Sequence, residues 1–311
     1  MVTVKCINMY ANENVIIQLI RNFYGDVQFT ETNPDILICG VFGKRCYIEQ
    51  YINTNVVKCT IFFTGENTER NHLHFKEYDD YMLDTVNISL GFKRISHKNY
   101  IRFPLYYSFA NNINIDGIAN NIIIDRDIHG SILNLNKNNP TTESNKKNFM
   151  CMVSRHDPNK IRYELFYLFR LHKNVNSGGR YLNTLGKRIG GHHSGTEMFD
   201  FYKDHKFNIC VENSDGDGYV TEKIANAILA GCIPIYYGPN PVDPEIFNNN
   251  RIINIKDYPD KNELLKKVKE LDCDDTKYND FISQKPLTDT AEKIIGDALI
   301  SLKNKLDTLL K

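Results

Sequence analysis

The chain has no tryptophan and no excess of charge of either sign. Its 311 residues contain 38 Lys plus Arg and 38 Asp plus Glu, so the formal net charge is zero. This balance gives no electrostatic reason to expect a nucleic acid or an anionic membrane as partner. Hydrophobic residues make up 41% of the chain, which is typical of a soluble globular protein with a sizeable core.

Long apolar runs are also missing. The longest ones, Val56–Phe63 and Ala227–Gly238, are too short to span a bilayer and are interrupted by polar residues or proline. The first residues, Met1–Asn8, are typical of a short strand and lack the basic and apolar regions of a signal peptide. We therefore expect a soluble cytoplasmic protein without a transmembrane segment.

Several well-known motifs are absent. The eight cysteines include no C-x-x-C pair and no zinc-ligand spacing, and several lie inside apolar strand-like runs. We expect them to be reduced core residues. Neither G-x-G-x-x-G nor a Walker-type G-K-[ST] occurs, which argues against a dehydrogenase and against a P-loop nucleotidase.

Apolar runs of strand length alternate with helical patterns, and this alternation predicts an α/β fold. The polar stretch Asn111–Lys147 has weak periodicity, and its C-terminal part is typical of a linker. We therefore predict two domains, residues 1–145 and residues 146–311, with a long amphipathic helix from Thr290 in the second. The expected strands are Val2–Ile7, Asp35–Cys39, Asn55–Phe63, Phe149–Val153, Phe207–Val211 and Ile233–Tyr236, and the expected helices are Asn12–Phe23, Lys160–Leu171, Glu197–His205 and Thr221–Ala230.

The most informative stretch is Lys206–Lys223. It predicts a buried strand, a loop of Gly, Asp and Asn residues, and then a helix that Thr221 can cap and that Gly231 ends. The start of such a helix attracts anions, and a pyrophosphate is a natural ligand there. Lys223 in the first turn is disfavoured by the helix dipole unless an anion is present. The alternative is that Glu222 and Lys223 are ordinary charges on a solvated helix face.

This stretch resembles the signature of the α-1,3-fucosyltransferases of glycosyltransferase family 10, in which a strand and E-N precede Y-V-T-E-K. Three further segments resemble the family's motifs in the right order, and together the matches cover about positions 60 to 240. The four matches are Glu212-Asn213 with Tyr219–Lys223, the G-E-N of Gly65–Asn67, the R-x-P-L-Y-Y of Arg102–Tyr107, and the glycine-rich N-T-L-G loop of Ser177–Gly186.

The resemblance implies a GT-B architecture, in which two Rossmann-like domains face each other across a cleft. It further implies an inverting transfer of fucose from GDP-fucose to a hydroxyl of an acceptor oligosaccharide or glycoconjugate, with an α-1,3 linkage to GlcNAc as the family default. By the same match Glu66 is the general base, which removes the acceptor proton in a single displacement. The donor is bound by Arg162 and Lys223 at the diphosphate, Glu222 at ribose or fucose hydroxyls, and Asn213 and Tyr219 along the pocket.

We expect that the reaction requires no cofactor and that a divalent cation at most stimulates it. Two groups of residues in the sequence could nevertheless suggest a metal site. Asp215-Gly-Asp217 imitates a D-x-D metal motif but lies in a turn where Asp is common. His72, His74, His192 and His193 lack an obvious third zinc ligand.

Two other functions stay open at this point. One is a GT-B transferase that uses another nucleotide sugar, and the other is a non-catalytic module that binds a nucleotide sugar or a glycan. Thr68–Asp84 is longer and more charged than the corresponding family segment, which should face the acceptor. This difference leaves the acceptor open.

Overall fold

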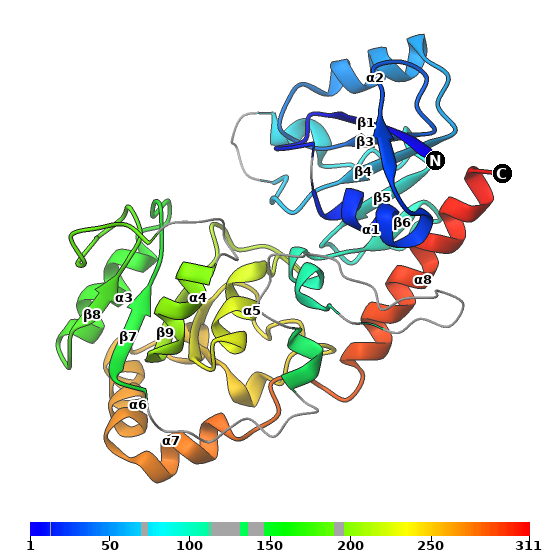
Figure 1. Ribbon diagram of the computed structural model, residues 1–311. Coiled ribbons are helices and arrows are strands. Elements are labelled where there is room, and N and C mark those ends of the chain that lie inside the picture. Colours follow the sequence, from blue (N-terminus) through cyan, green and yellow to red (C-terminus); the bar gives the residue numbers. More distant parts are fainter. Residues whose placement is uncertain (13, 70–73, 112, 114–130, 136–145, 190–195) are drawn as a thin grey trace. The chain divides into compact units, whose positions relative to one another are not determined.

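The computed structural model contains two α/β units, each built on a parallel sheet (Figure 1). The first unit comprises Met1–Asp125 and Glu292–Lys311, and the second comprises Arg126–Ala291. The structure describes residues 1–311 except 13, 70–73, 112, 114–130, 136–145 and 190–195. Most of the predicted linker therefore lies outside the described residues.

The first unit contains a six-stranded parallel sheet in the order β2-β1-β3-β4-β5-β6. Its central strands β3 and β4 are apolar except for Thr60 and are buried on both faces, as expected for a parallel sheet covered by helices. The strands are β1 (Val2–Ile7), β2 (Val27–Phe29), β3 (Ile36–Cys39), β4 (Cys59–Phe63), β5 (Ile88–Gly91) and β6 (Tyr100–Arg102).

Helix α1 (Val15–Tyr24) shows how the sequence sets local structure in this unit. The Asn14 side chain caps the helix by accepting hydrogen bonds from the backbone N–H groups of Ile16 and Ile17, at 3.0 and 3.2 Å. Gly25 ends the helix with φ 80°. The other helical segments before the linker are α2 (Arg45–Thr54) and the 3-10 turns η1 (Phe75–Tyr78) and η2 (Leu105–Phe109).

The second unit contains a five-stranded parallel sheet in the order β11-β10-β9-β7-β8. Figure 1 shows helices α3, α4 and α5 beside this sheet. The strands are β7 (Asn148–Met152), β8 (Val175–Ser177), β9 (His205–Val211), β10 (Ile233–Tyr237) and β11 (Ile253–Asn254). The helical segments are η3 (Ile132–Leu135), α3 (Ile161–Arg170), α4 (Thr196–Lys203), α5 (Glu222–Leu229), η4 (Asn249–Arg251), η5 (Ile255–Asp257), α6 (Lys261–Cys273) and α7 (Asp275–Ile282).

The strand order creates a switch point in the second sheet. From β7 the chain proceeds to β8 on one side, whereas β9 pairs with the other side of β7. In open α/β sheets, ligands bind in the crevice beyond the carboxyl ends of the strands at such a switch point. The carboxyl ends of β7 and β9 are therefore the place to look for a ligand site in this unit.

The C-terminal helix α8 (Ala291–Leu309) packs on the first unit, whereas the sequence predicts it in the second domain. Its apolar stripe is buried, including Leu299, Leu302 and Leu306. A hydrogen bond also connects the helix to this unit, in which the Tyr24 hydroxyl of α1 donates to the Asp307 carboxylate of α8 at 2.7 Å. The helix thus returns to the unit in which the chain began, so the first unit is not contiguous in sequence. No helix among the described residues is long and apolar enough to cross a membrane.

Leu306→Ala is expected to lower the free energy of unfolding by about 3 kcal/mol, because it removes a fully buried side chain and leaves a cavity. Urea denaturation of the whole chain measures this loss. Asn304→Ala, an exposed position on the same helix, is the matched control and should change stability by less than about 0.5 kcal/mol. Equal stability of the two variants would contradict the packing of α8.

Candidate active site

The buried carboxylate of Glu212 organises the start of α5. Glu212 directly follows β9 and is 0% exposed. Its Oε1 accepts a hydrogen bond from the Thr221 backbone N–H at 2.8 Å, and its Oε2 accepts one from the Thr221 hydroxyl at 2.7 Å. The Tyr236 hydroxyl lies 3.4 Å from Oε1. One side chain thereby joins the ends of β9 and β10 to the first turn of α5.

Thr221 occupies the predicted N-cap position of α5, and Gly231 with φ 70° follows the end of the helix as predicted. The Thr221 side chain makes no capping hydrogen bond to the helix, because its hydroxyl donates to Glu212 instead. The backbone N–H groups in the first turn of α5 therefore donate no hydrogen bond to the Thr221 hydroxyl, which would be their usual acceptor. This arrangement suits a helix start that binds an external anion.

Lys223 lies in the first turn of α5 and points toward this carboxylate. Its ammonium is 3.1 Å from Glu212 Oε2, 2.9 Å from the Thr221 hydroxyl and 3.4 Å from Glu222 Oε1. Burial acts to lower the pKa of Lys223, but the charges of Glu212 and Glu222 outweigh it and raise the pKa above its ordinary value. Lys223 therefore carries a fixed positive charge in a place where the helix dipole alone would disfavour it.

Arg162 reaches the same strand end from α3. The residue is 4% exposed, and its guanidinium donates to the His156 carbonyl oxygen at 3.0 Å, to the Asn213 side-chain oxygen at 3.0 Å and to the Val211 carbonyl oxygen. His156 follows β7, whereas Val211 and Asn213 lie at the end of β9. Arg162 thus bridges the two loops that leave the switch point.

The structure brings together the predicted donor-site residues of the second unit. Arg162 and Lys223, each in the first turn of a helix, contact the segment Val211–Asn213 from two directions. Tyr219 is buried at 1% exposure and acts electrostatically on Lys223, and Glu222 contacts the Lys223 ammonium. The side chain of Glu212, a residue without a predicted role, bonds Lys223 and Thr221 at this place. Its position after a buried strand was the available signal, since a carboxylate there must be paired.

The glycine-rich loop after β8 packs against the loop after β7. Tyr181 donates its backbone N–H to the Ser154 carbonyl oxygen at 2.9 Å. A Cβ atom on Gly179 would lie 2.1 Å from that same oxygen, so only glycine fits. The glycine-rich N-T-L-G loop therefore lies at the same edge of the sheet as the carboxyl ends of β7 and β9.

Glu66 lies in the first unit, in the loop that follows β4. The Thr64 hydroxyl accepts from the Glu66 backbone N–H at 3.0 Å and donates to the Glu66 carbonyl oxygen at 2.9 Å, which fixes the loop. A Cβ atom on Gly65 would lie 3.3 Å from Leu105, and the rings of Phe63 and Phe103 are 6.1 Å apart. The G-E-N and R-x-P-L-Y-Y segments therefore contact each other at the carboxyl edge of the first sheet.

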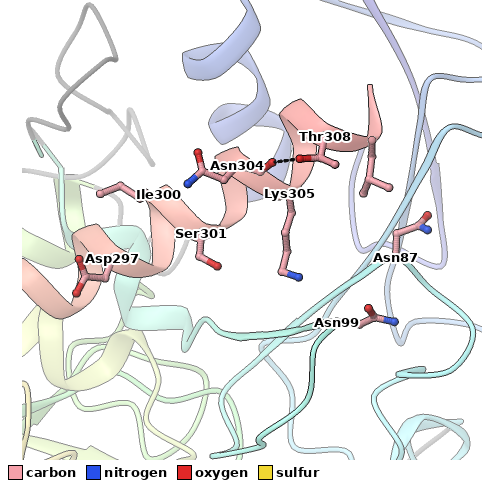
Figure 2. Close-up of a pocket in the computed structure, with 9 residues that line it drawn as sticks. Asn87, Asn99, Asp297, Ile300, Ser301, Asn304, Lys305 and Thr308 are labelled. Carbon is pink, nitrogen blue, oxygen red and sulfur yellow. Dashed lines mark hydrogen bonds between the residues drawn. The ribbon is translucent and has the colours of Figure 1, made fainter. Parts of the chain in front are cut away.

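A cavity of about 640 Å³ lies elsewhere in the first unit, between α8 and the segments that precede β5 and β6. Asn87 and Asn99 line it together with Asp297, Ser301 and Lys305 of the helix, and Figure 2 shows the Lys305 side chain extending on the side where the two asparagines lie. Because the strands are parallel, residues that precede β5 and β6 lie at the amino edge of the sheet, and Glu66 follows a strand at the carboxyl edge. None of the predicted site residues lines this cavity.

The residues that could suggest a metal site either pair with other side chains or lie outside the described residues. The Asp215 carboxylate pairs with the Lys256 ammonium at 2.5 Å, and the ring of His74 contacts Glu77 at 2.9 Å. His72, His192 and His193 lie outside the described residues.

Within the described part of the chain, one group has atoms close enough to hold a metal ion. It comprises His172, Asp272 and Cys273, whose ligand atoms lie within 4.8 Å of one another. Asp272 already accepts from His172 at 2.8 Å and from Lys173 at 2.6 Å, and Lys206 lies 3.5 Å away. Two ammonium groups beside the carboxylate oppose a metal ion, so we interpret the group as a structural ion-pair cluster.

Asp272→Asn is expected to lower the free energy of unfolding by about 2 kcal/mol at pH 7, because it removes a buried charge-assisted acceptor. Burial raises the pKa of Asp272, but the bonds from Lys173 and His172 outweigh this effect and lower the pKa. The ion pairs therefore stabilise the fold above the unfolded pKa of about 3.9, and this contribution is lost as the pH falls through the lowered folded value. Urea denaturation should show that variant and wild type differ less in the free energy of unfolding below pH 4 than at pH 7. A difference that does not depend on pH would contradict the ion pairs.

Comparison with known proteins identifies related sequences for both units. Residues 142–294 match the family model described as glycosyltransferase family 10 (fucosyltransferase), C-terminal, and residues 2–109 match the FucT N-terminal domain of α-(1,3)-fucosyltransferases. The chain is 28% identical to α-(1,3)-fucosyltransferase FucT of Helicobacter pylori over 293 residues, which cover 86% of this chain and 59% of that protein. It is 29% identical over 141 residues to 4-galactosyl-N-acetylglucosaminide 3-α-L-fucosyltransferase 9 of Bos taurus, covering 45% of this chain and 37% of that protein. The chain thus spans less than two thirds of the length of these curated relatives.

The fold is also that of a solved fucosyltransferase. A crystal structure of an α1,3-fucosyltransferase superposes with a TM-score of 0.69 at 22% identity, covering 98% of this chain and 90% of that one. The same enzyme type with GDP-fucose superposes with a TM-score of 0.67 at 21% identity. The predicted α/β fold of GT-B class is confirmed. Because family models match both halves of the chain and the fold agrees, the chain belongs to glycosyltransferase family 10.

Proposed function

We propose that the protein is an inverting fucosyltransferase that moves fucose from GDP-fucose to a hydroxyl of an acceptor glycan. The convergence of Arg162 and Lys223 on the strand end Val211–Asn213 carries this proposal. Two cations in the first turns of two helices, at the switch point of a parallel sheet, suit the negative charge of a nucleoside diphosphate. Family membership supplies the expectation that the nucleotide is GDP and the sugar is fucose.

The leaving group explains why cations are placed at this position. When the bond between fucose and GDP breaks, the diphosphate gains negative charge. Cations and helix N–H groups aimed at it stabilise that charge in the transition state more than in the ground state. Lys223 suits this role because neighbouring carboxylates keep it protonated. We propose that Glu222, next to Lys223, binds ribose or fucose hydroxyls, and that Asn213 and Tyr219 contribute to the same donor site.

Inversion at the sugar requires one displacement and therefore a base that removes the acceptor proton. We assign this role to Glu66, which the hydroxyl of Thr64 holds at the end of β4. No covalent intermediate and no second nucleophilic carboxylate are needed for an inverting reaction.

We further propose that the reaction needs no cofactor, and that a divalent cation at most stimulates it. Asp215, the first carboxylate of the D-x-D-like turn, is paired with Lys256. We also propose a cytoplasmic location, because the eight cysteines, all in the described part of the chain, are thiols and five of them are buried. The acceptor sugar is proposed to be GlcNAc, with the new α linkage at its 3-hydroxyl.

A donor panel on a glycan array tests the proposal. Purified protein is incubated with GDP-fucose, GDP-mannose and UDP-sugars, and the products are analysed by mass. We expect a deoxyhexose to be added from GDP-fucose alone, and acceptors that carry Galβ1-4GlcNAc to react best. Transfer from another nucleotide sugar would establish a different GT-B transferase, and binding without any product would establish a non-catalytic module.

A further inference from the structure

The carboxylate of Glu212 is the least exposed charged group of the proposed donor site. It is 0% exposed, and its oxygens receive the Thr221 N–H, the Thr221 hydroxyl and the Lys223 ammonium. A buried charge is costly unless it is paired and hydrogen-bonded. Because the Lys223 ammonium balances this charge, moving it away would leave Glu212 without that cation.

The ammonium of Lys223 has no donor to spare. An ammonium group carries three N–H donors. Its three contacts go to Glu212 at 3.1 Å, to the Thr221 hydroxyl at 2.9 Å and to Glu222 at 3.4 Å. A diphosphate oxygen that binds Lys223 must therefore replace one of these three partners.

The contact with Glu222 is the one most easily exchanged. It is the longest of the three, and the Glu222 side chain is 11% exposed, compared with 0% for Glu212. Exchange at this contact also leaves the buried Glu212 paired with the ammonium. Glu212 lies beneath the helix start and has no such exposed side.

We propose that Glu212 is a positioning residue of the donor site, which keeps the Lys223 ammonium charged and fixed while an incoming diphosphate displaces Glu222 from it. This inference rests on the proposed GDP-fucose site. Diphosphate binding then has a second effect, because the displaced Glu222 carboxylate becomes available to the hydroxyls of the donor. Glu212 itself touches no reacting atom and acts through Lys223.

Calorimetric titration of the whole chain with GDP, from pH 7 to pH 9, tests the proposal. Glu212→Gln should weaken GDP binding about 30-fold at pH 7, the loss expected from a misplaced charge-assisted bond. Compared with wild type, its GDP affinity should fall further as the pH rises, because the variant loses the largest influence that raises the pKa of Lys223, whereas burial still lowers it. Glu222 and Tyr219 also face the ammonium and still raise its pKa, so the expected change is a direction only. Glu212→Asp, which keeps the charge, should show the same dependence of GDP affinity on pH as the wild type.

Asp272→Asn is the matched control. Asp272 is another buried carboxylate of the second unit, and it pairs with Lys206 near the amino end of β9. Glu212 follows the carboxyl end of the same strand, about 20 Å away along an extended chain. A stability loss shared by both variants with a change in GDP affinity only in Glu212→Gln supports the positioning role. GDP affinity and pH dependence equal to those of Asp272→Asn would overturn it.

If Glu212→Gln does not fold, Thr221→Val carries the test. The Thr221 hydroxyl bonds both Glu212 and Lys223 but makes no capping bond to α5, so its loss leaves the helix start intact. About fivefold weaker GDP binding is expected, and unchanged binding would overturn the proposal. Failure of the wild-type chain to bind GDP would overturn the proposed function and this inference with it. Normal wild-type binding with unaffected variants would overturn the inference alone.

Discussion

Glu66→Gln is expected to lower kcat for fucose transfer about 1000-fold and to leave GDP affinity within about twofold of wild type. The glutamine has the same size as the glutamate, and the hydrogen bonds between the backbone of residue 66 and the Thr64 hydroxyl are kept. The amide cannot, however, take up the proton of the acceptor hydroxyl. Initial-rate kinetics with saturating GDP-fucose measure the first quantity, and calorimetry with GDP measures the second.

Glu69→Gln is the control for this variant. Glu69 lies three positions further along the same segment, is exposed, and pairs with Lys93 at 2.7 Å. Surface ion pairs of this kind contribute little to stability, so transfer and binding should both stay near wild type. Unchanged turnover in Glu66→Gln would remove the base assignment. A parallel loss in Glu69→Gln would show that the loop, and not the carboxylate of Glu66, is what matters.

Arg162→Ala is expected to lower kcat/KM for GDP-fucose about 100-fold, because it removes a cation from the switch point where the leaving group develops charge. The same change leaves the carbonyl oxygens of His156 and Val211 without their donor. We therefore also expect the free energy of unfolding to fall by about 3 kcal/mol. Steady-state kinetics with varied GDP-fucose and urea denaturation measure the two effects.

Two comparison variants separate binding from folding. Arg170→Ala removes an exposed arginine from the same helix, where it lies 5.3 Å from the Phe166 ring, and should change kcat/KM less than twofold. Arg162→Lys keeps a positive charge but cannot reproduce the forked set of hydrogen bonds, so an intermediate loss is expected. Normal kinetics in Arg162→Ala would mean that the donor binds elsewhere.

The strand–loop–helix unit around the donor site was predictable because each part has a local signal. Phe207–Val211 is apolar except for Asn208, as expected for a strand buried on both faces. The loop after it is rich in residues that tolerate turns, and Gly231 adopts the positive φ that ends a helix. The predicted strand and helix lie within a residue or two of the observed β9 and α5.

Short or weakly patterned elements escaped prediction. The strands β8 and β11 have three and two residues, too few to show a period. Helix α2 has Ile48 as its only buried residue, so it carries no apolar stripe. The stripe on α8 was visible, but a stripe does not say which unit covers it. That choice is made by non-local contacts such as the bond between Tyr24 and Asp307.

For the candidate site, the sequence reveals the types of residue, whereas the contacts between them require the structure. The types and spacing of Glu212, Thr221 and Lys223 were visible in the sequence, and the family resemblance assigned Lys223 to the donor. Their mutual hydrogen bonds were not visible, because the direction of a side chain just past a strand depends on the fold around it. The sequence therefore predicts where the site lies, and the structure adds that Lys223 is held by a buried carboxylate.

A crystal structure of the protein with GDP tests the central claim most directly. We expect the diphosphate to lie at the start of α5, with an oxygen within hydrogen-bonding distance of the Lys223 ammonium and of a first-turn N–H group. In that complex Lys223 should still contact Glu212 and should have lost its contact with Glu222. GDP bound away from the carboxyl ends of β7 and β9 would contradict the account.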